Sequence, residues 1–164
     1  MRPDEMPQSS GDADDAWRRA HLAEGALKAA RTPGGWTRST AEPLKILIVD
    51  DERPVREMLA RYVAALGYRP YSASYAEEAL RVLRRRRMDL VMVDIRMPGR
   101  DGGWLIEQAH ARWPSLPMLI VTGVEELDPH ITLQPGVVGY LVKPFTAEAL
   151  GDALRRALSG PEED

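Results

Sequence analysis

The stretch ILIVDDE, residues 46–52, runs four apolar residues directly into three acids. A short apolar run bounded by polar residues is typical of a strand that is buried on both faces of a parallel sheet. Like charges held close together destabilise a fold. The adjacent carboxylates of Asp50 and Asp51 therefore need a physical reason to stand at the end of this strand.

Short apolar runs recur along the chain at residues 44–49, 68–73, 89–94, 117–122 and 137–142. The intervals between them mostly carry apolar residues at helical spacing. Helix-start signals also occur there: Pro54, Thr146, and Ser74 with Glu77 at capping-box spacing. Strands that alternate with helices predict an α/β fold, a doubly wound parallel sheet covered by helices on both faces.

The interval 123–136 departs from this pattern. Its sequence, GVEELDPHITLQPG, contains Pro129 and Pro135 and the β-branched pair Ile131 and Thr132. Proline and β-branched residues both oppose a long helix. We therefore expect the fourth helix of the fold to be short or irregular.

Polar side chains follow the apolar runs where strands of a parallel sheet would end. Asp50 and Asp51 follow the first run, Asp94 the third, Thr122 the fourth and Lys143 the fifth. Three crowded carboxylates favour a bound cation, and hard oxygen ligands suit Mg²⁺. A lysine and a hydroxyl beside that cation form a pocket for an anion with several oxygens, such as a phosphoryl group. A single aspartate is also what a helix cap or a turn requires, but caps do not explain all four strand ends together.

The stretches IVDDE, VMVDIRMPGRDGG, LIVTG and GYLVKPF resemble, in order and spacing, the receiver domain of two-component response regulators. The resemblance is to the single-domain, chemotaxis-regulator-like type and covers residues 44–160, the whole α/β part. It implies a flavodoxin-like sheet of five parallel strands in the order 2-1-3-4-5, with five helices.

The resemblance also implies a role for each acid. Asp94 is the expected phosphoacceptor. Asp50 and Asp51 match the acidic pair that holds Mg²⁺ with Asp94, and the backbone carbonyl of Arg96 is the expected further ligand. Mg²⁺ is the only cofactor implied.

Three further residues match those that respond to the phosphoryl group. Thr122 matches the switch hydroxyl, Lys143 the lysine that pairs with the phosphate, and Tyr140 the aromatic switch residue that turns inward after phosphorylation. The bond between Lys143 and Pro144 is expected to be cis, which is accessible before proline.

The implied function is that of a receiver in a phosphorelay. A phosphohistidine on a sensor histidine kinase or a histidine phosphotransfer protein would donate its phosphoryl group to Asp94. The chain would then change its binding to an unknown downstream protein or pass the phosphate on. It would catalyse its own Mg²⁺-dependent phosphorylation and dephosphorylation, and we classify it as a signalling switch and not as an enzyme. Because only SGPEED follows Leu158, we expect no output domain, and a homodimer is left open.

The sequence outside residues 44–160 predicts little packed structure. Residues 1–43 are interpreted as a flexible N-terminal extension with a helix at 14–31, whose apolar stripe is mostly alanine, and residues 161–164 as a tail. An alternative is a helix that docks on the receiver or joins two copies, with Trp17 as its anchor.

Composition limits the classes of function. The chain lacks cysteine, which excludes disulfides and thiolate chemistry, and its net charge of −3 argues against a chain-wide surface for nucleic acid. No apolar run approaches the ~20 residues that cross a bilayer, and no signal-peptide core is present, so we expect a cytoplasmic protein without a membrane partner. We interpret the basic cluster at 84–87 as the solvated end of the second helix and expect no nucleic-acid partner.

Two other functions fit parts of this pattern. A receiver fold that works without phosphorylation would be expected to lack some of the site residues, and here all are present. A Mg²⁺-dependent phosphatase of the haloacid-dehalogenase-like kind would carry a second acid two residues after its nucleophile, where this chain has Arg96. A small phosphodonor would separate the three functions by stoichiometric labelling, no labelling or sustained turnover.

Overall fold

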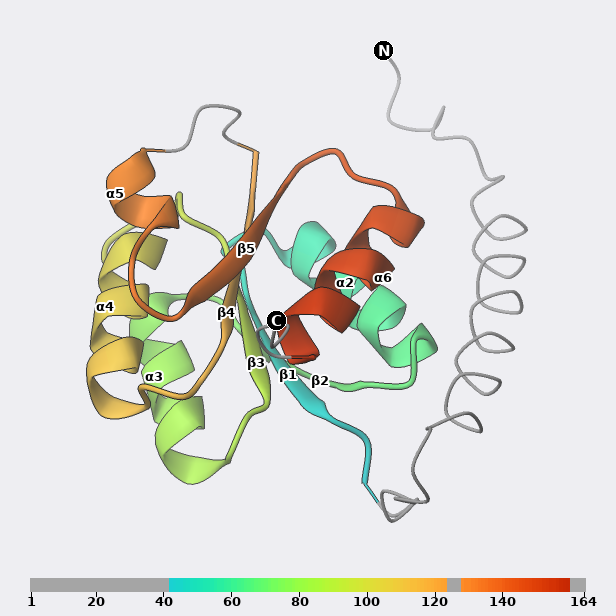
Figure 1. Ribbon diagram of the computed structural model, residues 1–164, viewed down its shortest axis with the longest axis horizontal. Helices are drawn as coiled ribbons and strands as arrows, with labels where there is room; N and C mark the ends of the chain where they lie inside the picture. Colours follow the sequence, from blue (N-terminus) through green and yellow to red (C-terminus); the bar gives the residue numbers. More distant parts are fainter. Residues whose placement is uncertain (1–41, 124–127, 160–164) are drawn as a thin grey trace, which may run out of the picture.

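The computed structural model describes residues 42–123 and 128–159 (Figure 1). Residues 1–41, with the predicted helix at 14–31, and the tail at 161–164 lie outside the described residues. One sheet contains the five strands β1 (Lys45–Val49), β2 (Arg69–Ala73), β3 (Leu90–Val93), β4 (Met118–Thr122) and β5 (Val137–Val142). Their order is β2-β1-β3-β4-β5 and every neighbouring pair is parallel, so the predicted fold class and strand order are confirmed.

Helices cover both faces of the sheet (Figure 1). One face carries α3 (Ala76–Arg85) and α4 (Gly102–Arg112), and the other carries α2 (Arg53–Ala65) and α6 (Ala147–Leu158). Successive strand residues point to opposite faces, so each strand supplies both cores. In β1, Leu47 and Val49 join the core under α3 and α4, while Ile46 and Ile48 join the core under α2 and α6. This two-sided burial explains why the strands are apolar throughout.

Two of the three predicted helix starts are confirmed. Pro54 stands in the first turn of α2, and the Thr146 hydroxyl accepts a hydrogen bond from the Ala149 amide (3.0 Å) at the start of α6.

The predicted capping box of Ser74 and Glu77 is wrong. The N-cap of α3 is Tyr75, one residue later than the spacing predicts, so the third helical residue is Glu78. Its carboxylate accepts hydrogen bonds from the backbone amide (2.9 Å) and the hydroxyl (2.8 Å) of Ser74. The Ser74 bonds lower the pKa of Glu78, because they favour the charged form of its carboxyl group.

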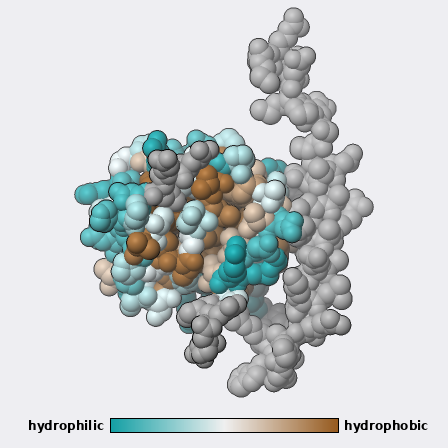
Figure 2. Space-filling model, turned by 45° about the horizontal axis from the view of Figure 1, so that its top comes forward, coloured by the Kyte–Doolittle hydropathy of each residue, from teal (hydrophilic) through white to brown (hydrophobic). Residues whose placement is uncertain are grey.

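The predicted short fourth helix is confirmed as α5 (Pro129–Thr132), a single turn. The Asp128 carboxylate accepts from the His130 amide (2.9 Å) and caps the turn, and Gly136 then takes a positive φ of 92° as the chain enters β5. β5 is an edge strand of the sheet, and it exposes 51% of Val138 and 57% of Tyr140. Figure 2 shows that hydrophobic patches on the visible side of the molecule are separated by polar side chains.

The described helices include none that is long and apolar enough to cross a membrane. The longest of them, α2, has 13 residues. The cytoplasmic location stays a prediction.

The start of α4 lies directly against the backbone that follows β3. The Gly102 amide donates to the Ile95 carbonyl (3.0 Å), and a Cβ added at Gly102 would lie 2.3 Å from the Asp94 carbonyl oxygen and 2.8 Å from the Ile95 Cα. Both of these neighbours are backbone atoms, which side-chain rotation does not move. Glycine is therefore required for α4 to approach Asp94 this closely.

We predict that Gly102→Ala destabilises the fold by about 3 kcal/mol, near the upper end of overpacking effects, because α4 has to move away from the strand end. Thermal or urea unfolding measures the loss. The matched control is Gly103→Ala, whose Cβ would meet only the Asp101 carboxylate at 3.4 Å. Equal stability of the two variants would show that the contact at Gly102 is not needed.

We predict that Glu78→Gln lowers stability at neutral pH by about 1 kcal/mol, since hydrogen bonds from Ser74 to a charged carboxylate are lost. A lowered pKa in the folded state means that this stabilisation is present above the usual value of 4.5 and is lost as the pH falls through the folded pKa. Unfolding curves of parent and variant should thus converge in acid. Glu77→Gln, an exposed neighbour in the same turn, is the control. A constant difference at all pH values would contradict the prediction.

Candidate functional site

Three carboxylates meet at the carboxyl-terminal ends of the parallel strands, which lie at the top of the sheet in Figure 1. Val49 pairs with Val93 in the parallel register of β1 and β3, so Asp50 and Asp94 follow neighbouring strands at the same level. One carboxylate oxygen from each of Asp50, Asp51 and Asp94 lies within 4.8 Å of the others. Asp50 is 1% exposed and Asp94 7%, whereas Asp51 is exposed and leaves the cluster open on one side.

Asp50 is held by three donors that come from different parts of the chain. Its carboxylate accepts from the Glu52 amide (2.9 Å) and from the Lys143 ammonium (2.7 Å). Its backbone carbonyl accepts from the Arg56 guanidinium (2.8 Å). Arg56 is not among the site residues predicted from the sequence, although a basic residue one turn into the helix after the acids is a signal that could have identified it. These bonds fix both the side chain and the backbone of Asp50.

The surroundings of Asp94 shift the pKa of its carboxyl group upward. Burial raises its pKa, and the nearby charges of Asp50 and Asp51 act in the same direction, while Lys143 opposes them. The Lys143 ammonium lies 3.7 Å from the Asp94 carboxylate, and the Arg96 amide donates to it at 3.2 Å. The Arg96 backbone thus lies beside the cluster through its amide, and the predicted role of its carbonyl as a metal ligand stays a prediction.

Lys143 reaches the cluster from the loop after β5. Its amide donates to the Thr122 carbonyl (2.7 Å), which ties the ends of β5 and β4 together. Burial acts to lower the pKa of Lys143, but the hydrogen bond to Asp50 and the charges of Asp94 and Asp50 outweigh it, so the pKa is raised. The peptide bond from Lys143 to Pro144 is cis, as predicted. The ammonium is therefore a charged counterion to two buried carboxylates.

The two predicted switch residues differ in their placement. Thr122 is fully buried at the end of β4, and its carbonyl is bonded to the amide of Lys143. Tyr140 is more than half exposed on β5, three residues before Lys143, and so lies outside the buried cluster. The structure thus brings the acids, Lys143 and Thr122 to one edge of the sheet and leaves Tyr140 at the surface beside them.

The donor set fits Mg²⁺. All three side chains that could ligate it are carboxylates, which are the hard oxygen ligands that this ion prefers. Mg²⁺ also keeps several of its waters, and the exposed position of Asp51 leaves room for them.

The chain is similar to part of several curated bacterial proteins. It is 39% identical over 125 residues to the response regulator protein FleR of Pseudomonas aeruginosa, covering 73% of this chain and 26% of FleR. It is 42% identical over 117 residues to the positive alginate biosynthesis regulatory protein of the same species, covering 70% of this chain and 47% of that protein. The chain thus spans at most about half of these two relatives, and the absence of an output domain stays a prediction.

Solved structures share the fold. The chemotaxis protein CheY4 of Vibrio cholerae matches with a TM-score of 0.66 and 30% identity over 71% of this chain and 99% of that chain. The response regulator TrrA of Thermotoga maritima, solved in complex with Mg²⁺ and BeF, matches with a TM-score of 0.65 and 28% identity over 70% of this chain and 99% of that chain. Both likenesses cover the part of the chain that holds the sheet.

One sequence-based classification needs correction. The sequence analysis classed the chain as no enzyme, while assigning to it catalysis of its own phosphorylation and dephosphorylation. A match to the receiver domain, a phosphorylation switch, contradicts that exclusion, because such chemistry on a domain's own side chain is itself catalysis. The classification as a non-enzyme is therefore withdrawn.

The family model of the response regulator receiver domain matches residues 46–155, from the first strand into the last helix. This range contains the acidic cluster, Thr122 and Lys143. The chain belongs to the receiver domain family of two-component response regulators.

Proposed function

We propose that Asp94 accepts a phosphoryl group from a phosphohistidine on a sensor histidine kinase or a histidine phosphotransfer protein. The observation that carries this proposal is the convergence of the buried Asp94 carboxylate with two other acids and with the Lys143 ammonium, which lies 3.7 Å from it. Receivers of response regulators act with such phosphodonor proteins, which supports the choice of donor. The phosphorylated form then changes which protein the chain binds, or passes the phosphoryl group on.

Phosphoryl transfer requires the site to bring two negatively charged groups together, the Asp94 carboxylate and the phosphoryl group. The Asp94 carboxylate oxygen attacks the phosphorus in line, the bond from phosphorus to the histidine nitrogen breaks, and the histidine keeps the electron pair. Mg²⁺, when bound by Asp50, Asp51 and Asp94, supplies positive charge that offsets the charge on the phosphoryl oxygens. The hydrogen bond from Arg96 holds the Asp94 carboxylate in one orientation.

Lys143 supplies the second positive charge. In this structure its ammonium is 2.7 Å from Asp50 and 3.7 Å from Asp94. Phosphorylation replaces the single charge of Asp94 with about two negative charges on a group that extends farther from the backbone. We propose that Lys143 then pairs with the phosphoryl oxygens, which turns its role from counterion of the acids to ligand of the phosphate.

The switch is proposed to run through Thr122 and Tyr140. A Thr122 hydroxyl that moves toward the phosphoryl oxygens leaves space at the end of β4. The exposed Tyr140 ring then turns inward, which changes the surface of β5. The one-turn α5 next to this strand leaves Tyr140 and Val138 accessible to a downstream protein in the form described here.

We predict that acetyl phosphate with Mg²⁺ adds one phosphoryl group to the parent chain and none to Asp94→Asn. Intact-mass spectrometry measures the gain. The matched control is Asp152→Asn, an acid on α6 whose side chain is half exposed, and it should be labelled like the parent. Equal labelling of Asp94→Asn and the parent would show that another residue accepts the phosphoryl group. A parent chain that binds Mg²⁺ but is not labelled would overturn the proposed function.

We predict that Lys143→Met lowers the melting temperature of the chain in the absence of Mg²⁺. We also predict that added Mg²⁺ increases the melting temperature of this variant by more than it increases that of the parent. Removing the ammonium leaves two buried carboxylates without their counterion, a change that costs about 3 kcal/mol. A cation that binds only the folded state restores stability by mass action. Scanning fluorimetry with and without MgCl₂ measures both effects.

Lys45→Met is the control for this measurement, because Lys45 lies at the start of β1, on the opposite edge of the sheet. Its response to Mg²⁺ should equal that of the parent. A Lys143→Met variant with the parent's response to Mg²⁺ would show that Lys143 does not share the carboxylates with the metal.

A further inference from the structure

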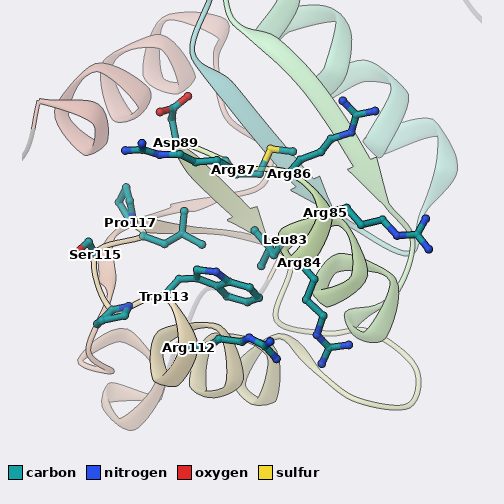
Figure 3. A pocket seen from close by; sticks show the side chains of 13 residues that line it. Leu83, Arg84, Arg85, Arg86, Arg87, Asp89, Arg112, Trp113, Ser115 and Pro117 are labelled. Carbon is teal, nitrogen blue, oxygen red and sulfur yellow. The ribbon is translucent and has the colours of Figure 1, made fainter.

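A cavity of about 540 Å³ lies at the edge of the sheet opposite to the acidic cluster (Figure 3). It is bounded by the carboxyl-terminal ends of α3 and α4 and by the chain entering β3 and β4. Its apolar wall includes Leu83, Trp113, Leu116 and Pro117. This volume falls within the range of about 300–1,000 Å³ that small-molecule sites occupy.

The cavity is lined by five arginines, Arg84 to Arg87 and Arg112, and by one acid, Asp89. The Asp89 carboxylate accepts a hydrogen bond from the Lys45 amide (2.7 Å). Within residues 42–123 and 128–159, the ion pairs formed involve none of these five arginines. Since the side chains of Arg85 and Arg86 point away (Figure 3), Arg84, Arg87 and Arg112 give the cavity an excess of positive charge that the described carboxylates do not neutralise.

Two of the arginines converge. Figure 3 shows Arg84 extending from α3 and Arg112 from α4 toward each other, whereas Arg85 and Arg86 point away from the cavity. The helix dipole favours one cation at the end of each helix, which accounts for the presence of these residues. It does not account for two cationic side chains from different helices that extend toward the same space beside one cavity, because like charges repel. An anion with several oxygens between them would remove that repulsion and accept hydrogen bonds from both.

The apolar wall beside the two arginines is fixed in place. Trp113 caps α4 through a hydrogen bond from its amide to the Ala109 carbonyl (2.7 Å), and the Leu116 amide donates to the Trp113 carbonyl (3.0 Å). The Arg112 guanidinium lies over the Trp113 ring, 5.5 Å from its centre, so the charge is in a cation–π contact with the aromatic surface. A ligand that joins a phosphate to a flat ring matches this arrangement.

We propose that this cavity binds a nucleotide, with its phosphates between Arg84 and Arg112 and its base against Trp113. The site stands at the other edge of the sheet from Asp94, so it does not depend on the proposed phosphoryl transfer. It would give the domain a second input, the concentration of a small phosphorylated metabolite.

The test is calorimetric titration of the full chain with adenosine diphosphate in the absence of divalent metal. We expect one bound molecule per chain, with affinity reduced about tenfold or more by Arg84→Gln or Arg112→Gln, since each removes a charge-assisted hydrogen bond. Trp113→Leu should weaken adenosine diphosphate but leave inorganic pyrophosphate unchanged. Asp94→Asn should bind like the parent, which separates this site from the phosphoacceptor.

Two arginine controls decide whether the cavity or diffuse charge is responsible. Arg61→Gln removes an exposed charge from α2, on the other face of the sheet, and Arg85→Gln removes one from the same run that points away from the cavity. Both should bind like the parent. An equal loss in these controls, an absence of adenosine diphosphate binding by a parent that melts cooperatively, or tighter binding of a single-stranded ten-nucleotide DNA with losses spread over Arg84 to Arg87 would overturn the proposal.

Discussion

Repulsion among buried carboxylates is the constraint that the rest of this structure resolves. The parallel register of β1 and β3 places Asp50 beside Asp94, and neither carboxylate is free to turn into solvent because both are nearly fully buried. Lys143 relieves this repulsion, yet it arrives from β5, which is separated from β1 by β3 and β4. The counterion is thus in place only when the four strands from β1 to β5 in this order, β1, β3, β4 and β5, have come together. The charge balance of the site therefore depends on the order of the strands in the sheet.

The sequence predicts the fold well because its signals are local. Strands buried on both faces are continuous apolar runs. Pro129 and Pro135 limit the length of the helix in their segment whatever its tertiary contacts are. The same locality explains the errors. The spacing of Ser74 and Glu77 satisfies a capping pattern, but the extended backbone of Tyr75 starts α3 one residue later and brings Glu78 to Ser74 instead. A shift of one residue in the start of α3 depends on how the helix packs on the sheet. The spacing of residues in the sequence carries no information on that packing.

The residues of the site also fall into those that local sequence predicts and those that depend on packing. Acids, hydroxyl and lysine could be named from the sequence because each directly follows an apolar run. Arg56 was missed because it contacts a backbone carbonyl, and its position one turn into the helix does not by itself show which group it contacts. The preference of Lys143 for Asp50 over Asp94 is a difference of 1 Å between two ion pairs, and only packing sets it. The interpretation of residues 84–87 as a solvated helix end is consistent with the exposure of all four arginines, and the proposed nucleotide site gives Arg84 a further role that the sequence pattern does not indicate.

The positions of these two groups of charges have a consequence for the molecule as a whole. The total charge of the chain is only −3, but three of its acids form one cluster at the carboxyl-terminal ends of the strands, and five of its arginines belong to the cavity at the other ends. These two groups of opposite charge are therefore separated along the direction of the strands. A partner that carries a basic surface is turned toward the acidic edge, and away from the arginine edge, while it is still several ångströms distant. Selectivity for the correct face thus begins during diffusion, and it weakens as salt shortens the reach of the field.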